Sequence, residues 1–286
     1  MAVALAAAAA LLFGVLAVAI RVALRRAPDP DAGSLATTLV AGSLCAVIAA
    51  AFGEWTRTPW HETWPFFTAG IVTPGISQLL FTRAVQLIGP SRTTILVGIS
   101  PVLSAVIAIA LLGEPVRAAL VLGTLLVVAG GTMLAWERGG WRGLVSLGTG
   151  LGTLAAVLFS VRDNFIRWAE RGDAVPGVVA ATCSLSAATV AIAIVVAVRG
   201  ELVPRTRRVA RPFLVGGLAY GGAYACLLAA FDRGRVTIVT PLYATESLWA
   251  VVISAVVLRR TERVGLRLAA ASLLVVAGGA LIGGFR

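Results

Sequence analysis

Four polar or ionisable residues interrupt stretches of the sequence that are otherwise apolar. Arg162, Asp163 and Asn164 follow one another within one stretch, and Glu246 lies near the middle of another, in the run YATESLW. An ionisable group at the centre of a membrane helix costs roughly 2.5–3.5 kcal/mol on insertion scales, so it usually faces a cavity or a partner. In a cavity, Arg162 can hold an anionic group of a ligand, and Glu246 a cationic group or a proton. We therefore expect these four residues to bind a small solute.

The composition indicates the solvent in which the chain folds. Hydrophobic residues make up 59% and charged residues 13% of the 286 residues, and the mean hydropathy is +0.94. Soluble domains carry roughly 25% charged residues, and runs of about 20 apolar residues predict transmembrane helices. We expect an all-α integral membrane protein that crosses the cell membrane, plasma or inner, several times.

Arginine accounts for all 24 basic residues, and the formal net charge is +11. In a soluble chain this charge would favour nucleic-acid binding. Here the arginines cluster between apolar stretches, which is typical of loops that face a cytoplasmic leaflet. We therefore expect the lipid bilayer and a small-molecule substrate as partners, and no nucleic acid.

The sequence carries no pattern typical of an enzyme or a metal centre. Cys45, Cys183 and Cys226 lie inside apolar stretches without a CxxC motif, and we expect them to pack as small side chains. The single histidine, His61, lies in a connection. An integral membrane enzyme would need a nucleophile–base pair or a metal cluster near the headgroups. We expect no catalysis, no metal and no cofactor.

Apolar runs and loop residues predict about ten spans joined by short connections rich in Pro, Gly and Arg. Trp55, Trp60 and Trp64 fall at predicted span ends, where an amphipathic ring suits the headgroup layer, whereas Trp249 falls within a span. No stretch is long and polar enough to form a soluble domain. The predicted limits are 3–22, 35–53, 66–86, 92–112, 116–136, 146–166, 176–198, 212–231, 236–258 and 264–284.

Two stretches of the sequence occur in related copies. The heptapeptide LLVVAGG runs from Leu125 to Gly131 and again from Leu273 to Gly279, an offset of 148 residues. LFGVLAVAIR, which begins at Leu12, aligns with LFSVRDNFIR, which begins at Leu158, at an offset of 146 residues. Copies that agree in order and nearly in offset predict an internal duplication.

The duplication predicts two five-helix halves, residues 1–138 and 139–286, that form one membrane unit. Because five is an odd number, the second half must enter the membrane from the opposite side, which makes an inverted repeat. Such repeats hold a substrate site near the midplane and open it to either side in turn. The expected fold therefore favours a transporter that works by alternating access, although a fold alone does not prove a function.

Aromatic and amide side chains extend the expected site. A helical repeat places residues three and four apart on one face, which joins Glu246 to two neighbours and pairs two tyrosines of the preceding span. The repeat alignment sets a glutamine of the third span opposite one of those tyrosines. The added site residues are Tyr220, Tyr224, Tyr243, Trp249 and Gln78.

Two motifs of the first half carry a resemblance to a known family. Phe13 and Gly14 are followed by Arg21 in the first span, and the run SPVLSAVIAIALLGEPVRAALVLGTLLVVAGG holds Pro101 and then Gly113–Glu114. In these motifs and in its two halves the chain resembles the drug/metabolite transporter superfamily, in its ten-helix EamA-like branch. The resemblance implies a secondary carrier of small metabolites that needs no ATPase subunit.

The second half departs from the motif, because Trp249 stands at the position of Pro101. The departure leaves the fold expectation intact but weakens any symmetry of the site. Opposite charges in one pocket favour a zwitterion, such as an amino acid, among the metabolites and drugs that such a carrier moves. Proton coupling and exchange both stay open.

Other interpretations compete with the transporter site. Arg162 can form a structural ion pair with Glu246 or Asp163, and the tyrosines and Trp249 can simply pack. The chain can also be a non-transporting scaffold or a channel, but its polar residues are scattered rather than arranged around one pore. The direction of transport and the choice between monomer and dimer stay open.

The orientation in the membrane is predicted in two ways that disagree. Arginines concentrate in the connections after odd-numbered spans. The positive-inside rule then places both termini outside. The family resemblance implies cytoplasmic termini instead.

Overall fold

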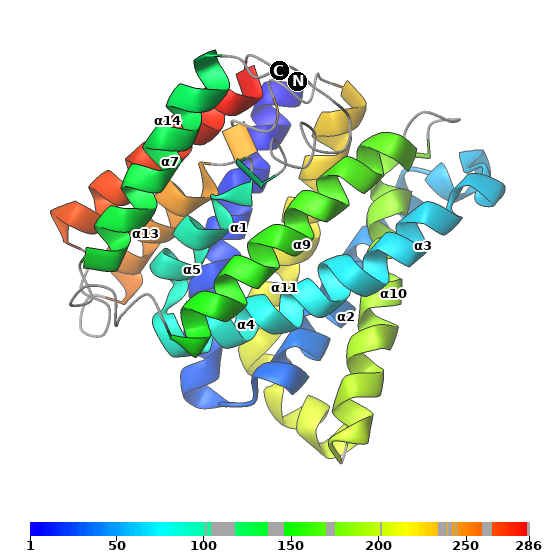
Figure 1. Ribbon diagram of the computed structural model, residues 1–286. Helices are drawn as coiled ribbons and strands as arrows, with labels where there is room; N and C mark the ends of the chain where they lie inside the picture. The colour runs from blue at the N-terminus through cyan, green and yellow to red at the C-terminus, as the bar shows by residue number, and fades with distance from the viewer. Residues whose placement is uncertain are drawn as a thin grey trace.

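The computed structural model describes residues 1–100, 102–103, 118–136, 146–169, 175–200, 202–233, 239, 242–243, 245–258 and 265–284. Within these ranges the regular structure is helical, which confirms the all-α expectation (Figure 1). Pro101, Gly113 and Glu114 lie outside the described residues. The helices are α1 (Ala2–Arg26), α2 (Pro30–Ala51), η1 (Glu54–Arg57), η2 (Trp60–Glu62), α3 (Trp64–Gly70), η3 (Ile71–Ile76), α4 (Ser77–Ile88), α5 (Pro90–Val97), α7 (Ala118–Trp136), α9 (Leu147–Ala169), α10 (Gly177–Val198), α11 (Leu202–Arg233), α13 (Glu246–Val257) and α14 (Leu266–Gly284).

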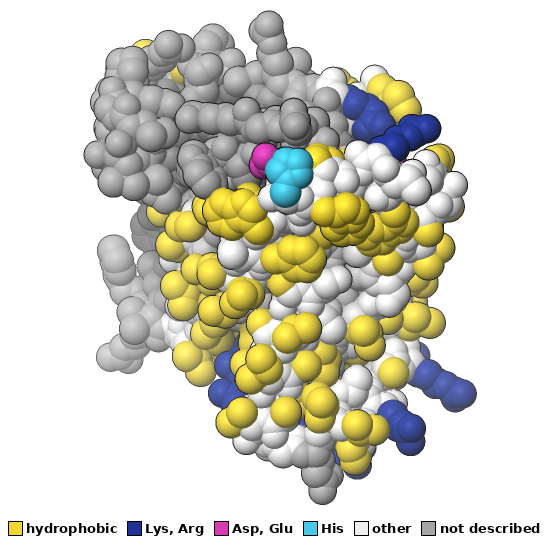
Figure 2. Space-filling view, turned by 90° about the vertical axis from the view of Figure 1, so that its right-hand side faces the viewer, with side chains coloured by type: hydrophobic (Ala, Val, Ile, Leu, Met, Phe, Trp, Pro, Cys, Tyr) yellow, Lys and Arg dark blue, Asp and Glu magenta, His cyan; other side chains and the backbone are white. Residues whose placement is uncertain are grey.

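The outer surface of the helices suits a bilayer. Among the described residues, five segments are long and apolar enough to cross a membrane. Large apolar side chains such as Val47 and Val190 are more than half exposed. Figure 2 shows apolar side chains across the middle of one face, with basic side chains toward its upper and lower margins. The chain is a multi-pass membrane protein, and the five segments that meet this criterion are Ala2–Arg26, Pro30–Ala51, Trp60–Ile88, Gly177–Val198 and Leu202–Ala230.

The packing of the helices is nearly unchanged when the two halves are exchanged. α1 packs against α11 and α13, and its counterpart α9 packs against α4 and α5. α2 packs against α11, and its counterpart α10 packs against α3 and η3. The pairs α2 with α10 and α7 with α14 are their own counterparts. Because α1 and α9 also run in opposite directions (Figure 1), the architecture is the expected pair of inverted repeats.

The two heptapeptides meet where α7 and α14 cross. A Cβ atom at Gly130 would lie 2.7 Å from the carbonyl oxygen of Ala271, and one at Gly278 would lie 2.5 Å from that of Gly123. Both pairs are related by the offset of 148 residues, so each copy of the motif packs against the other in an antiparallel crossing. Glycine permits this approach because it has no side chain. The duplicated motif is therefore a packing device.

The third span differs from the continuous helix that was predicted over 66–86. It is divided into α3, η3 and α4, and Thr73 has extended torsion angles of φ −143° and ψ 114°. Pro74 accounts for the break, because it lacks an N–H and its ring crowds the carbonyl four residues earlier. The Thr73 hydroxyl donates to the carbonyl oxygen of Leu158 at 3.3 Å. The break thus fastens this span to α9 and places Gln78 in the first turn of α4.

The predicted start of the eighth span at residue 212 is wrong. The arginine-rich run PRTRRVARP, expected as a connection, is helical, and α11 begins at Leu202. Arginine has a high helix propensity, and Pro204 lies in the first turn, where proline is tolerated. The arginines therefore occupy the first turns of α11, ahead of its apolar stretch.

A cluster of ion pairs closes the end of the molecule where α1 turns into α2. Asp31 is 5% exposed and accepts hydrogen bonds from Arg83 Nε at 2.9 Å and Arg199 Nη1 at 2.8 Å. Asp29 caps α2 through the Ala32 amide and accepts from Arg205 Nε at 2.7 Å. Arg199 and Arg205 belong to the second half, so the cluster ties the halves together. We call this the arginine-rich end, and its exposed arginines include Arg25, Arg26, Arg199, Arg207, Arg208 and Arg211.

Candidate substrate site

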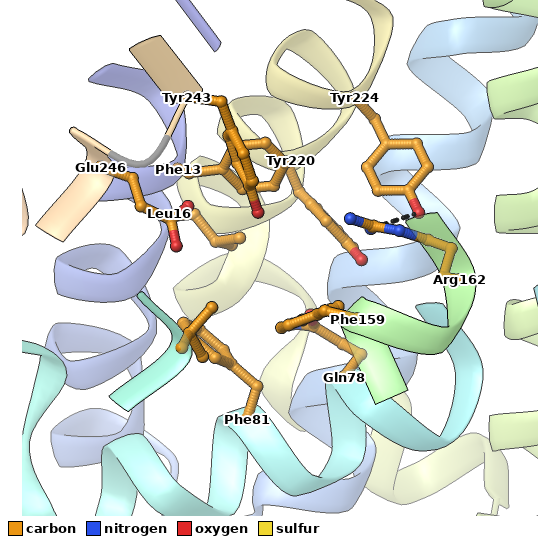
Figure 3. Close-up of a pocket in the computed structure, with 11 residues that line it drawn as sticks. Phe13, Leu16, Gln78, Phe81, Phe159, Arg162, Tyr220, Tyr224, Tyr243 and Glu246 are labelled. Carbon is orange, nitrogen blue, oxygen red and sulfur yellow. Dashed lines mark hydrogen bonds between the residues drawn. The ribbon is translucent and has the colours of Figure 1, made fainter. Parts of the chain in front are cut away.

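A small cavity lies between the two halves, at the level of the middle of α1 (Figure 3). Its volume is about 20 Å³, whereas one water needs roughly 10–15 Å³. The cavity therefore has room for about one water molecule. Side chains from α1, α4, α5, α9, α11, α13 and the segment before α13 surround it. The lining residues are Phe13, Leu16, Gln78, Phe81, Val97, Phe159, Arg162, Tyr220, Tyr224, Tyr243 and Glu246.

Arg162 supplies a positive charge at one end of the cavity. Its side chain lies on α9, is 5% exposed, and donates from Nη1 to the hydroxyl of Tyr224 at 3.0 Å. The guanidinium carbon is 5.1 Å from the centre of the Phe159 ring and 5.7 Å from that of Tyr224. These contacts are within the range of cation–π attraction. The rings and the hydroxyl hold the guanidinium in one place, where it can receive an anion.

Glu246 lies at the opposite end of the cavity (Figure 3). It is 5% exposed and is the first residue of α13. The sequence predicted a continuous helix over 236–258 with Glu246 near its middle. Instead Thr245 lies in a turn and donates its hydroxyl to the Leu242 carbonyl at 2.6 Å. A carboxylate at a helix start also interacts favourably with the helix dipole, so the turn both positions Glu246 and stabilises its charge.

Aromatic rings occupy the space between the two charged groups. Phe13 lies at the centre of this group, with edge contacts to Tyr220, Tyr224 and Tyr243 at centroid distances of 6.1, 6.4 and 5.3 Å. Tyr220 and Tyr224 contact each other at 5.4 Å. Such edge-to-face pairs are the preferred geometry of aromatic rings. The wall between the charges is therefore aromatic and preorganised.

Gln78 enters the cavity from the first half. It is 2% exposed, and its amide nitrogen is 3.4 Å from the Thr82 hydroxyl one turn later on α4. The backbone carbonyl of Gln78 also accepts from Ser34 on α2, at 3.4 Å. These contacts fix a polar amide in a lining that is otherwise apolar on this side.

The structure brings together most of the side chains that the sequence singled out. Those of Arg162, Glu246, Gln78 and the three tyrosines line the cavity. Trp249 does not line it: its side chain is 40% exposed and its Cβ packs where Gly14 leaves room. Glu246 and Trp249 both lie on the unbroken helix α13, so their spacing of three is kept, but Trp249 lies nearly one turn further along, where α13 packs against Gly14 of α1. Asp163 and Asn164 are on α9, and their side chains lie outside the described part of the chain.

Five lining residues were missed at the sequence level because each is apolar and resembles ordinary core. The repeat alignment relates three of them to other lining residues. Phe13 and Phe159 are counterparts at an offset of 146 residues, and so are Leu16 and Arg162. The missed residues are Phe13, Leu16, Phe81, Val97 and Phe159.

The counterparts show that the cavity lies on the symmetry axis of the inverted repeat. Both members of the pair Phe13 and Phe159 line it, as do both members of the pair Gln78 and Tyr224. An axial cavity is the one place that both halves can open equally, each from its own side. The position and the lining make this cavity the candidate substrate site.

Comparison with known proteins agrees with this geometry. The family model of the EamA-like transporter family matches residues 1–136 and 146–284. The chain belongs to the EamA-like transporter family. A solved structure described as "Crystal structure of protein" has 23% identity and a TM-score of 0.68 to this EamA-like chain, and the match covers 98% of this chain and 94% of that chain. At this identity the likeness shows the fold alone, and no curated protein matches.

The first-helix motif of this EamA-like protein has a structural role at each position. Phe13 lines the cavity, and Gly14 lets Trp249 on α13 approach α1. Arg21 donates to the carbonyl oxygens of Val85 at 3.2 Å and of Gln86, at the last turn of α4. The Val85 carbonyl also accepts from the Gly89 N–H at 3.1 Å, so Arg21 adds a second donor at this helix end. The motif thus joins α1 to the elements around the site.

Proposed function

We propose that this protein is a secondary-active transporter that moves small zwitterionic metabolites by alternating access. One observation supports the proposal above the others: a single axial cavity holds Arg162 at one end and Glu246 at the other. Burying a charged group costs several kcal/mol. Two buried charges on opposite sides of an aromatic wall suit a solute that carries both charges itself.

Each part of the cavity has a role in the proposed binding. The guanidinium of Arg162 presents a planar fork of donors, which matches a carboxylate better than a point charge does. Glu246 accepts hydrogen bonds from the ammonium group of the solute. The rings of Phe13, Tyr220 and Tyr243 cover the apolar part between them. An amino acid or a similar small metabolite fits this order of groups.

The small size of the cavity supports a conformation in which the two halves are closed on each other around the site. A volume of about 20 Å³ leaves no room for a solute, so binding requires the halves to separate. At the arginine-rich end this means breaking the pairs Asp31–Arg199 and Asp29–Arg205, which join the halves. Re-forming them would close that end while the other opens.

Exchange transport tests the proposal. Purified protein is reconstituted into proteoliposomes, which are loaded with an unlabelled solute of one of four classes: zwitterionic, anionic, cationic or uncharged. Uptake of labelled solute is then followed. We expect exchange of zwitterions. We expect Arg162→Leu to reduce it about 100-fold, because truncating one member of a buried charged pair costs roughly 2–5 kcal/mol. Absence of exchange with every class, or wild-type exchange by this variant, would contradict the proposal.

Leu16→Met provides the matched control. Leu16 is the counterpart of Arg162 in the first half and lines the same cavity. A swap that conserves volume usually costs less than about 1.5 kcal/mol, so exchange should stay within about tenfold of wild type. A large loss here would mean that shape, and not charge, governs the site.

Glu246→Gln separates two roles of the carboxylate. If Glu246 binds the ammonium group of the solute, this variant loses exchange as Arg162→Leu does. If Glu246 carries a coupling proton, exchange continues, but a pH gradient no longer drives accumulation. We expect the first outcome, since Glu246 faces Arg162 along the length of one cavity (Figure 3).

A further inference from the structure

A second hollow lies on the outside of the helix bundle, separate from the candidate substrate site. It is an open groove of about 430 Å³ between α11 and α13, with α1 as its floor. Its walls are apolar and include Val15, Val18 and Val22 of α1 and Val257 of α13. Arg26 and Arg211 stand at one end, and both side chains are exposed. The groove therefore combines an apolar channel with a cationic mouth.

The dimensions of the groove match half a bilayer. From Val15 to Arg26 the helix advances by 11 residues, or about 16 Å at 1.5 Å per residue. The hydrocarbon core is roughly 30 Å thick, so one leaflet is about 15 Å. Val15 lies near the middle of α1, and Arg26 is its last residue. The groove thus reaches from the headgroup level to the midplane.

The charge at the mouth favours an anion. Asp29 and Asp31, the carboxylates near this end among the described residues, are engaged by Arg205, Arg83 and Arg199. Within the same part of the chain no carboxylate pairs with the arginines at the mouth. Basic pockets between membrane helices bind anionic headgroups, with about 1 kcal/mol gained per arginine near the surface.

We propose that this groove binds one anionic phospholipid, with an acyl chain along the valines and the phosphate between Arg26 and Arg211. Because α1 and α13 also carry Phe13 and Glu246 of the candidate substrate site, an occupied groove would brace both helices. The proposal does not depend on the transported solute.

Lipid titration of the purified full-length chain in detergent tests the proposal. Phosphatidylglycerol and phosphatidylcholine with the same acyl chains are compared by native mass spectrometry and by thermal unfolding, since a ligand that binds the native state raises the melting temperature. We expect phosphatidylglycerol to bind and stabilise, and phosphatidylcholine to do so far less. Equal effects of the two lipids, or the same stabilisation by inorganic phosphate alone, would overturn the proposal.

One double variant locates the site, and a second double variant controls for charge. The double variant Arg26→Gln, Arg211→Gln should bind phosphatidylglycerol roughly 30-fold more weakly, which is about 1 kcal/mol for each arginine. Arg207→Gln, Arg208→Gln removes the same charge from exposed positions of α11 outside the groove and should bind as wild type does. Equal weakening by both double variants would mean diffuse attraction and would reject the site.

Val215→Trp blocks the groove while keeping its charges. Val215 lines the groove and is 59% exposed, so a larger side chain there need not disturb the core. We expect this variant to lose phosphatidylglycerol binding although Arg26 and Arg211 remain. Wild-type binding by Val215→Trp would show that no acyl chain enters the groove.

Discussion

The two halves of the molecule are alike in packing and unlike in chemistry. At one pair of counterparts in the cavity the first half has Leu16 and the second has Arg162, and at another Gln78 faces Tyr224. Glu246 also comes from the second half. The duplicated backbone supplies two similar halves, and the charged side chains of the candidate substrate site, Arg162 and Glu246, both come from the second half.

The same contrast appears where α1 packs against α13 and where its counterpart α9 contacts Ser100. Gly14 of α1 lies against Trp249 and Ala250 of α13 without any hydrogen bond between side chains. At the counterpart crossing Ser160 of α9 donates to the Ser100 carbonyl at 2.9 Å. Ser100 in turn donates to the Val97 carbonyl at 2.6 Å. In a regular helix this carbonyl would accept from residue 101, but that residue is a proline and has no N–H. The geometry is kept while the chemistry has diverged.

The ends of the bundle differ as well. At an offset of 146 residues, the counterparts of Asp29, Asp31 and Arg199 are Val175, Gly177 and Gly53, which carry no charge. Ion pairs therefore join the halves at the arginine-rich end and cannot form between the equivalent positions at the other. We therefore expect the two ends of the bundle to be held closed with unequal strength.

The strongest test of the likeness between the halves is the α7–α14 crossing. We expect Gly130→Ala and Gly278→Ala to destabilise the protein by similar amounts, about 1–3 kcal/mol each, because either Cβ would press on backbone of the facing helix. Thermal unfolding in detergent measures the effect.

Gly150→Ala is the control for these two variants. A Cβ at Gly150 on α9 would meet no heavy atom within 4 Å, so the better helix propensity of alanine should stabilise by up to about 1 kcal/mol. If only one of the two crossing variants is destabilised, the reciprocal packing of the halves is wrong.

The ion pairs at the arginine-rich end predict that Asp31→Asn destabilises the protein less than the two glycine variants do. We expect a loss of about 1 kcal/mol, less than for a fully buried charged hydrogen bond, because the side chain of its partner Arg199 is 54% exposed. We also expect easier opening at the arginine-rich end. A cysteine at position 16, in a chain whose three native cysteines are replaced, should then react faster with an impermeant thiol reagent added on that side.

Glu62→Gln is the matched control at the opposite end. Glu62 pairs with His61 at 3.5 Å, and the His61 side chain is 75% exposed. Exposed pairs contribute roughly 0–1 kcal/mol, so neither stability nor cysteine labelling should change measurably. Faster labelling with Glu62→Gln than with Asp31→Asn would contradict the proposed role of the ion pairs.

The sequence predicts the frame of the molecule because the relevant signals are repeated. Apolar runs of the length of a bilayer give the spans, and the twin heptapeptides give the crossing of α7 with α14. Arg162 and Glu246 stand out because a charge within an apolar run needs a cavity or a partner. Their placement in one cavity follows from the inverted repeat, which brings α9 and α13 to the same axis.

What the sequence does not predict depends on interruptions of helices. Pro74 divides the third span, and the turn at Thr245 divides the span predicted over 236–258. Glu246 and Trp249 lie three apart on the unbroken helix α13, but spacing alone does not show that only Glu246 reaches the cavity. Leu16 and Phe159 carry no signal of their own, since an apolar residue in an apolar helix is ordinary core. The arginine-rich start of α11 was expected to be a loop because charge alone does not show whether a segment is helical.

The smallest expected effect isolates a single ion pair between the halves. The pKa of Asp29 is lowered from its ordinary value, first by the hydrogen bond from Arg205 and then by the backbone amide of Ala32, against the opposing effect of burial. Asp29→Asn removes the charge but keeps the helix cap, since Asn and Asp cap about equally well. We expect a loss of about 0.5 kcal/mol at neutral pH.

The sign of the pH dependence makes this test specific. Because the pKa of Asp29 is lower in the folded protein, its stabilising effect is present above the unfolded value of about 3.9 and is lost as pH falls through the folded value. The melting temperatures of wild type and Asp29→Asn should therefore differ at pH 7 and converge below about pH 4. Arg205→Gln should show the same convergence, since it removes the other half of the pair. A gap between wild type and Asp29→Asn that persists in acid would mean that the carboxylate acts through the cap, and that this pair does not hold the halves together.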